Sequence, residues 1–369
     1  MLLGASLIVR DEAEHLTRCL RSLVDVVDEI VVVDTGSVDD SVAVARSFGA
    51  RVLHRAWDGD FSAARNLGLA AVTADWVLYI DADEHLRPVT RAAVAAGLAD
   101  GDRHIAYRVL LQPRQSFTAY REHRVWRNRP DIRFRGVIHE AITPDLGRIA
   151  ADEGLEIGLI DLYLEHEGYE GDLTAKHRRN LPLLRQQVEV DPDRVYLWGE
   201  IGRSHAGLGE IDEAMAAWEE GLARLRRRGD PTAADCLVLV DLIAAHAEQG
   251  RPDAALVREA DRLFPDNLLV LWAGAIDAAA RDDHAEVVRR LDRVLDADLI
   301  VAAESSVGFD RRIVGHWAWH ARGLARFHLG DFAGAADDFA AAEHDAPDVE
   351  EYRVKRRLAQ ARAAHRPER

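Results

Sequence analysis

Two carboxylates stand one residue apart at the end of an apolar run. The run Trp76-Val-Leu-Tyr-Ile leads directly into Asp81-Ala-Asp83-Glu84. If the strand stays extended to its end, Asp81 and Asp83 point to the same side, because side chains alternate along a strand. Carboxylate oxygens suit Mg²⁺ or Mn²⁺, and these ions often take one or two protein carboxylates and complete their coordination with substrate phosphates. The pattern favours a divalent-metal site for a diphosphate, although many strands end in paired acids that bind no metal.

Strand and helix patterns alternate through the first half of the chain. The expected elements are, in order, strand Leu2 to Val9, helix Glu14 to Val27, strand Glu29 to Val33, helix Val42 to Phe48 and strand Arg51 to His54. This β-α-β-α-β order is typical of a Rossmann-like nucleotide-binding fold. Ligands of such sheets bind at the carboxyl ends of the strands, where Asp11, Glu12, Asp34 and the Asp81 pair are expected.

Helical spacing replaces the strand patterns beyond about residue 176. Tyr196 to Trp218 matches a tetratricopeptide helix-turn-helix, and weaker copies cover Leu242 to Phe264, Leu271 to Leu295 and Trp317 to Ala342. Residues 301 to 315 read as an insertion. Stacked hairpins fit this pattern because one hairpin cannot bury its apolar face alone. We therefore expect an α/β domain over residues 1–175 and an all-α repeat domain over residues 176–369.

Composition limits the class of protein. The chain has 369 residues, enough for two domains, and a net charge of −17. This acidity argues against a nucleic-acid partner, which would need a basic footprint. Two distant cysteines, Cys19 and Cys236, exclude a disulfide framework or a four-cysteine zinc site. The opening apolar run ends at Arg10, too early for a transmembrane segment. We expect a cytoplasmic protein, with a peripheral place at the inner membrane face left open.

Four motifs in order resemble the family 2 glycosyltransferases of GT-A fold. They are Ser6-Leu-Ile-Val-Arg-Asp-Glu, Val31-Val-Val-Asp-Thr-Gly-Ser, Asp60-Phe-Ser-Ala-Ala-Arg-Asn and Asp81-Ala-Asp-Glu. More narrowly, the chain is similar to a bacterial branch that continues with Gly136-Val-Ile-His-Glu and His166-Glu-Gly-Tyr and then with tetratricopeptide-like repeats. The resemblance covers about residues 1 to 180. One departure is Asp11, where the family usually has asparagine.

The resemblance implies an inverting, metal-dependent enzyme of hexosyltransferase type. It would move a sugar from a nucleotide-diphosphate sugar, with UDP as the nucleotide, to an acceptor hydroxyl or thiol. The acceptor would be a cell-envelope glycan or lipid, or a peptide side chain. Mg²⁺ or Mn²⁺ would be held by Asp81, Asp83 and His166 and would stabilise the leaving diphosphate as a Lewis acid.

The resemblance also assigns donor-binding residues. Glu12, Asp34, Arg65 and Asp81 would bind the nucleotide sugar, Asp34 through the base or ribose and Arg65 through the phosphates. Two of these residues, Asp34 and Arg65, have a plainer alternative. Asp34 before Thr-Gly-Ser suits a turn or a helix cap, and Arg65 suits a salt bridge on a helix face.

A general base must remove the acceptor proton, and Glu140 is the candidate. The β-like run Arg133 to Ile138 would deliver it to the open edge of the sheet, and Glu84 is its rival. His139 and Arg127 are candidates for contacts to the diphosphate or the acceptor. Both His139 and His166 fall near the end of the expected catalytic domain, and either could instead be a hydrogen-bonded core residue. A cluster of arginines could line the acceptor or diphosphate cleft, with Trp126 available to stack on a sugar, or could belong to a solvated loop. Its members are Arg121, Arg124, Arg127, Arg129, Arg133 and Arg135.

Two other classes fit part of the pattern. A nucleotidyltransferase would carry a Gly-rich, basic phosphate loop after its first strand, where this chain has Arg10-Asp-Glu-Ala-Glu. A non-catalytic scaffold would use a silent transferase domain to carry the repeats, but the intact acids argue against it. The repeats themselves are expected to recognise the acceptor, to bind a protein partner or to form a homodimer.

Overall fold

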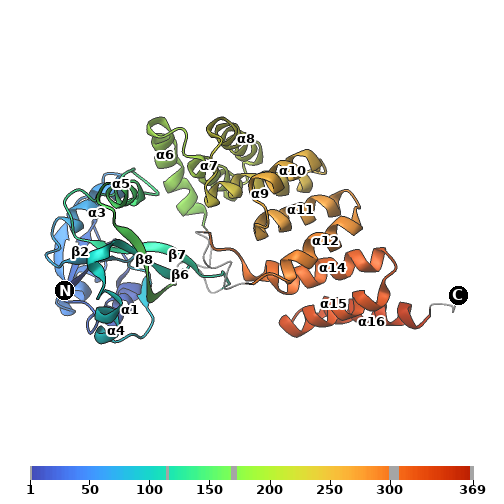
Figure 1. Cartoon of the computed structure of the whole chain (residues 1–369), viewed down its shortest axis with the longest axis horizontal. Helices are drawn as coiled ribbons and strands as arrows, with labels where there is room; N and C mark the ends of the chain where they lie inside the picture. Colours follow the sequence, from blue (N-terminus) through green and yellow to red (C-terminus); the bar gives the residue numbers. More distant parts are fainter. Residues whose placement is uncertain (1, 114–115, 168–172, 299–306, 366–369) are drawn as a thin grey trace. The chain divides into compact units, whose positions relative to one another are not determined.

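The computed structural model describes residues 2–113, 116–167, 173–298 and 307–365 (Figure 1). The chain divides into two compact units, the first running to Val190 and the second beginning at Asp191. Gly308 is counted with the first unit. The division falls at the end of helix α6 (Thr174–Val190), whereas the sequence placed the boundary near its start. Helix α6 therefore belongs to the first unit.

The first unit is built on one mixed sheet with the strand order β3-β2-β1-β4-β7-β6-β8-β5. The strands are β1 (Leu3–Val9), β2 (Glu29–Asp34), β3 (Arg51–His54), β4 (Trp76–Tyr79), β5 (Glu84–Leu86), β6 (His104–Gln112), β7 (Tyr120–Arg127) and β8 (Glu156–His166). β1 pairs in parallel with β2 and β4, and β2 pairs in parallel with β3. The carboxyl ends of these four strands therefore share one edge. The expected Rossmann-like order is confirmed.

Helices pack on both faces of this sheet. They are α1 (Ala13–Leu23), α2 (Ser41–Ser47), α3 (Phe61–Leu69), α4 (Arg91–Gly97) and α5 (Thr143–Glu153). α1 is amphipathic and buries Leu16, Leu20 and Leu23 in the core that contains β1. α3 and α5 contribute Leu69 and Leu146 to a second core. The sheet is thus shielded by helices on either side, as its continuous apolar strands require.

Two sequence expectations about the second core were incorrect. Trp126 is 1% exposed and packs in that core, so its side chain has no surface on which a sugar could stack. The expected strand Arg133 to Ile138 is an irregular loop with an isolated β-bridge between Arg135 and Ala141. The loop turns at Gly136 (φ 102°) and His139 (φ 48°), and these left-handed conformations interrupt an extended strand.

The second unit is a series of helical hairpins. The helices are α7 (Val195–Gly207), α8 (Ile211–Arg228), α9 (Cys236–Glu248), α10 (Ala254–Leu263), α11 (Leu268–Ala280), α12 (His284–Leu295), α14 (His316–His328), α15 (Phe332–Asp345) and α16 (Glu350–Ala364). Residues with positive φ end the first helices of the hairpins, among them Gly209, Gly250 and Gly330. This confirms the expected repeat domain. Part of the expected insertion at 301–315 lies outside the described residues.

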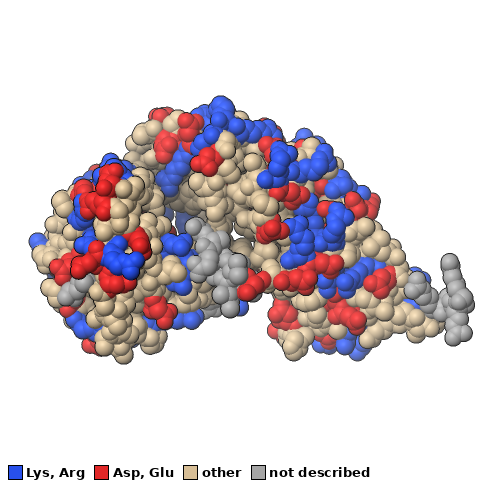
Figure 2. Space-filling model, viewed as in Figure 1, with Lys and Arg blue, Asp and Glu red and all other residues tan. Residues whose placement is uncertain are grey.

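Basic and acidic side chains are interspersed on the visible face of the helical unit (Figure 2). Beneath the surface, buried arginines pair with acids of other helices, as Arg290 does with Asp261 and Arg322 with Asp338. Across the described residues, each helix is too short or too polar to cross a membrane.

The first hairpin of the repeats gives a test of its packing. A β-carbon on Gly202 of α7 would lie 2.1 Å from the indole nitrogen of Trp218 in α8. Gly202→Ala should therefore lower the free energy of unfolding by about 1–3 kcal/mol, the usual cost of overpacking. Urea denaturation followed by circular dichroism measures this change.

Gly147 in α5 is the matched control. A β-carbon there meets nothing within 4 Å, so Gly147→Ala should stabilise the protein by up to about 1 kcal/mol through helix propensity. An unchanged midpoint for Gly202→Ala would contradict the close contact between α7 and α8.

Candidate functional site

A pocket of about 340 Å³ opens at the carboxyl ends of β1, β2 and β4. It is lined by Ile8, Val9, Arg10, Glu12, Thr35, Trp57, Phe61, Arg65, Asp81, Ala82, Asp83, His166, Lys176 and Arg179. The pocket lies where the topology of a parallel sheet leads one to expect a ligand. Of the residues predicted from the sequence, it brings together Glu12, Arg65, Asp81, Asp83 and His166.

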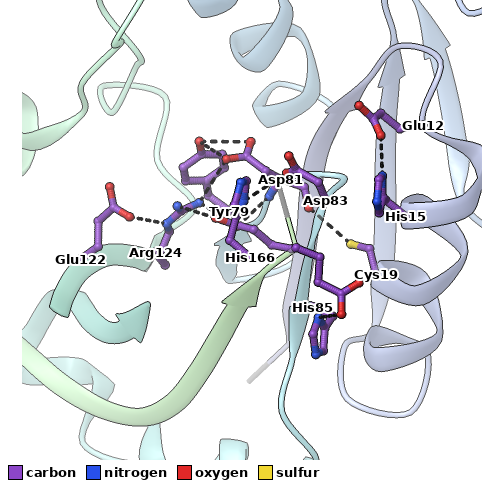
Figure 3. Close-up of polar contacts among 12 residues, drawn as sticks. Glu12, His15, Cys19, Tyr79, Asp81, Asp83, His85, Glu122, Arg124 and His166 are labelled. Carbon is purple, nitrogen blue, oxygen red and sulfur yellow. Dashed lines mark hydrogen bonds and ion pairs between the residues drawn. The ribbon is translucent and has the colours of Figure 1, made fainter. Parts of the chain in front are cut away.

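Acidic side chains and one imidazole form one side of this pocket. Asp83 lies in the turn after β4, and its carbonyl accepts a hydrogen bond from the Glu167 amide at 2.9 Å, just beyond β8. This contact brings His166 Nδ1 to 3.4 Å from Asp83 Oδ1, and Figure 3 shows both beside Asp81. Burial raises the pKa of the Asp83 carboxyl, His166 opposes this shift, and Asp81 adds to it. Glu12 faces the same pocket and contacts His15 at 2.7 Å.

Asp81 is held by protein donors. Arg65 Nη2 donates to Asp81 Oδ1 at 2.8 Å, and the Tyr79 hydroxyl lies 3.3 and 3.2 Å from the two carboxylate oxygens. Arg124 Nη1 lies 3.7 Å from the second oxygen. Burial acts to raise the pKa of Asp81, but Arg65 and then Arg124 outweigh it and bring the pKa to about 2. Asp81 is therefore ionised at neutral pH.

Arg65 of α3 connects two of the predicted acids. It is 8% exposed and donates to Glu140 through Nε as well as to Asp81 through Nη2. Its guanidinium lies 4.4 Å from the centre of the Tyr79 ring. Its Nη1 atom is buried and has no hydrogen-bond partner within the described part of the chain. An unsatisfied buried donor is costly, and Arg65 lines the pocket, so this guanidinium has one donor left over next to it.

A second buried arginine fixes the turn that carries the acids. Arg124 of β7 donates to both carboxylate oxygens of Glu84, at 3.1 and 2.9 Å. Glu84 is 2% exposed and also accepts from the Asp81 amide at 2.9 Å. Its oxygens are therefore occupied away from the pocket, and Glu84 is not placed to act as the rival general base.

Two predicted residues have other contacts. Asp34 accepts hydrogen bonds from the Ser37 and Gly36 amides and from His54, and these bonds outweigh burial and lower its pKa. These are the turn-shaping contacts that the sequence left as the alternative. Arg127 donates to the backbone carbonyls of His104 and Gly101. It holds the start of β6 and does not line the pocket, so the structure does not support the expected diphosphate or acceptor contact.

Glu140 and His139 lie in the loop after Gly136. The Glu140 side chain is 8% exposed and is paired with Arg65. Arg65 also pairs with Asp81, so it links the two acids. Neither Glu140 nor His139 is among the residues that line the pocket. The second half of the predicted His166-Glu-Gly-Tyr motif lies outside the described residues, although His166 itself is in place.

A family profile and several known proteins are similar to this sequence. The profile named Glycosyl transferase family 2 matches residues 7–146. A TPR repeat-containing protein of Synechococcus elongatus is 36% identical over 276 residues, which cover 70% of this chain and 66% of the relative. Residues 7–146 belong to glycosyl transferase family 2. The prophage-derived glycosyltransferase SunS of Bacillus subtilis is 24% identical over 61% of this chain and 54% of its own length. This chain thus spans less than two thirds of each of these relatives.

Two solved structures each align with about half of the chain. Glucosyl-3-phosphoglycerate synthase of Mycobacterium tuberculosis aligns over 51% of this chain and 79% of its own, with 17% identity and a TM-score of 0.36. The Cut9 and Hcn1 complex aligns over 52% of this chain and 34% of the matched chain, with 18% identity and a TM-score of 0.41.

The family 2 domain has pocket residues that the sequence reasoning missed. Lys176 and Arg179 come from α6, and Trp57 packs edge to face on Phe61 at 4.6 Å. Partial burial, and then the positive charge of Arg10, lower the pKa of Arg179. The signal in the sequence was the spacing of three between Lys176 and Arg179, which places both on one face of a helix. This face supplies positive charge to the pocket.

The donors of this pocket suit a hard divalent cation. In the part of the chain that the structure describes, no three His, Cys, Asp or Glu side chains converge closely enough to hold a metal. Asp83 and His166 nevertheless face the pocket together, and an ion such as Mn²⁺ can complete its coordination with phosphate oxygens. Asp81 is less suited, because its oxygens already accept from Arg65 and Tyr79.

The buried pair in this family 2 domain gives a prediction on stability. Arg124→Met leaves the Glu84 carboxylate buried without its cation, which should cost about 3–5 kcal/mol. Arg129, paired with Asp131 and Glu153 at a more exposed place, is the control. Arg129→Met should change the free energy of unfolding by about 0–1 kcal/mol. Chemical denaturation of both variants checks this, and equal losses would contradict the special role of the buried pair.

Proposed function

We propose that the family 2 domain transfers a sugar from a nucleotide-diphosphate sugar, a UDP sugar, to an acceptor hydroxyl or thiol. The observation that carries the proposal is the charge pattern of one pocket. Glu12 and Asp83 contribute acids, while Lys176 and Arg179 contribute cations, and Arg65 offers a buried donor without a partner. A metal-bound diphosphate complements such a pocket, because its oxygens bind a cation on one side and arginine or lysine on the other.

The donor would lie across the carboxyl ends of the parallel strands. Arg65 would donate to a phosphate oxygen through its Nη1 atom, and Lys176 and Arg179 would add charge to the same anion. Thr35 lines the pocket beside Asp34, at the strand end where the nucleoside is expected. The nucleotide role of Asp34 remains compatible with its turn contacts, since a carboxylate can accept further hydrogen bonds.

A divalent cation would be held by Asp83 and His166. When bound, it would neutralise the charge that develops on the leaving diphosphate. Asp81 has a different task in this arrangement, because its carboxylate orients the Arg65 guanidinium at 2.8 Å. The two acids of the motif would therefore have different roles: Asp83 would bind the metal, and Asp81 orients the Arg65 guanidinium.

Glu140 is proposed as the general base. It would take the proton of the acceptor nucleophile while the acceptor attacks from the side opposite the diphosphate, which inverts the anomeric centre. Its pairing with Arg65 keeps the carboxylate close to the site. The Glu140 carboxylate is 8% exposed. Binding of the acceptor would therefore have to bring its nucleophile into contact with this carboxylate.

The acceptor and the place of action remain open within this proposal. A cell-envelope glycan or lipid and a peptide side chain both offer the nucleophile, and the helical unit would recognise the acceptor, a protein partner or a second copy. A cytoplasmic site, including the inner membrane face, provides nucleotide sugars. The scaffold alternative leaves the buried Arg65 donor without a purpose, and we do not favour it.

A donor screen tests the proposed function. Protein with Mn²⁺ and a panel of nucleotide sugars should show thermal stabilisation and slow sugar hydrolysis with one donor. Asp83→Ala should lose the metal-dependent part of the stabilisation. Glu140→Gln should keep it but lower kcat for transfer by about 10²–10⁴, the range for a lost general base.

The exposed acid Asp102 provides the control. Asp102→Asn should behave as the parent protein in both assays. A folded protein that responds to no donor in the panel, with or without Mn²⁺, would contradict the proposed function.

A further inference from the structure

The loop of residues 135–141 holds Glu140 and is itself held from two sides. On one side it contacts α3: the Ser62 hydroxyl donates to the Gly136 carbonyl at 2.6 Å, and the Phe61 amide donates to the Val137 carbonyl at 3.0 Å. The Arg65 side chain, one turn later on the same helix, donates to Glu140. The first turns of α3 therefore set one boundary of the loop.

On the other side the loop contacts α6. Gln187 is 6% exposed, and its Oε1 accepts a hydrogen bond from the Val137 amide at 2.8 Å. A β-carbon on Gly136 would lie 3.1 to 3.2 Å from the Gln187 carboxamide. Gly136 has a positive φ, and it has no side chain that would crowd the Gln187 carboxamide. A glycine at this turn therefore allows the close approach of Gln187.

The same helix reaches the pocket from its other end. Lys176 and Arg179 line the pocket, and the Arg179 guanidinium lies 5.9 Å from the centre of the Phe61 ring. Between the two ends, Leu183 lies 3.3 Å from the position of a β-carbon on Gly59, just before α3. α6 thus lies along the start of α3 and the Glu140 loop.

We propose that Gln187 of α6 is a positioning residue for the transfer reaction, because it holds the Val137 peptide and thereby the loop that presents Glu140. This inference rests on the proposed function, since it assumes that Glu140 acts on the acceptor. It places α6 within the catalytic unit, although α6 is helical like the repeats that follow it. Catalysis is sensitive to small displacements, and a shift of about 1 Å can cost about a hundredfold.

Two substitutions at position 187 separate positioning from simple folding. Gln187→Met removes the acceptor with little change of volume, whereas Gln187→Glu keeps an acceptor oxygen for the Val137 amide. The neighbouring Gln186 is exposed, and Gln186→Met is the matched control. For each variant, kcat and the KM for the donor are measured, together with hydrogen exchange of the Val137 to Ala141 amides and the melting temperature.

The expected result is specific to kcat. Gln187→Met should lower kcat between about tenfold and a hundredfold, leave the donor KM unchanged and speed amide exchange in the loop. Gln187→Glu should recover most of kcat, and Gln186→Met should match the parent. Unchanged kcat in a folded Gln187→Met protein would overturn the proposal, as would a loss of kcat that Gln187→Glu does not recover.

The exchange measurement separates this proposal from the proposed function. It needs no substrate, so a parent protein without turnover would count against the proposed function alone. In that case, faster exchange of the loop in Gln187→Met but not in Gln186→Met would still support its positioning by Gln187. Equal exchange in both variants would overturn it.

Discussion

The site depends on one buried guanidinium, that of Arg65. It joins the first acid of the Asp81-Ala-Asp83 motif to Glu140, which lies 75 residues apart from Arg65 in the sequence. A buried arginine is stable only when its charge is paired, and these two carboxylates supply the pairing. The arrangement still leaves Nη1 without a partner in the described residues. The guanidinium that organises the acids therefore has one donor left over, which the proposed function assigns to the diphosphate.

A second guanidinium supports the first. Tyr79 lies between Arg65 and Arg124, with its ring centre 4.4 and 4.3 Å from the two charged groups. Arg124 in turn neutralises Glu84, whose carboxylate receives the Asp81 amide. The turn after β4 is therefore fixed by contacts on the side away from the pocket. Asp83 and His166, which lie 3.4 Å apart, face the pocket from this supported turn.

Much of this arrangement follows from the sequence. The strand ends, the paired acids, Arg65 and His166 occupy recognisable motifs, and the apolar periods predict the sheet and the hairpins. The rest depends on contacts between distant segments. The local sequence does not reveal that Arg124 of β7 pairs with the buried Glu84, or that the Gln187 side chain accepts a hydrogen bond from the Val137 amide. The loop after Arg133 reads as a strand, because a sequence of apolar and basic residues does not reveal the left-handed turn at His139.

We propose that Arg65, Asp83 and His166 together bind a metal diphosphate. Crystals grown with UDP and Mn²⁺ test it most directly, because anomalous scattering locates the ion independently of the protein density. We expect an anomalous peak within coordinating distance of Asp83 and His166, and a phosphate oxygen hydrogen-bonded to Arg65 Nη1. An ion bound elsewhere, or a UDP molecule whose phosphates lie away from Arg65, would rule out this metal diphosphate site.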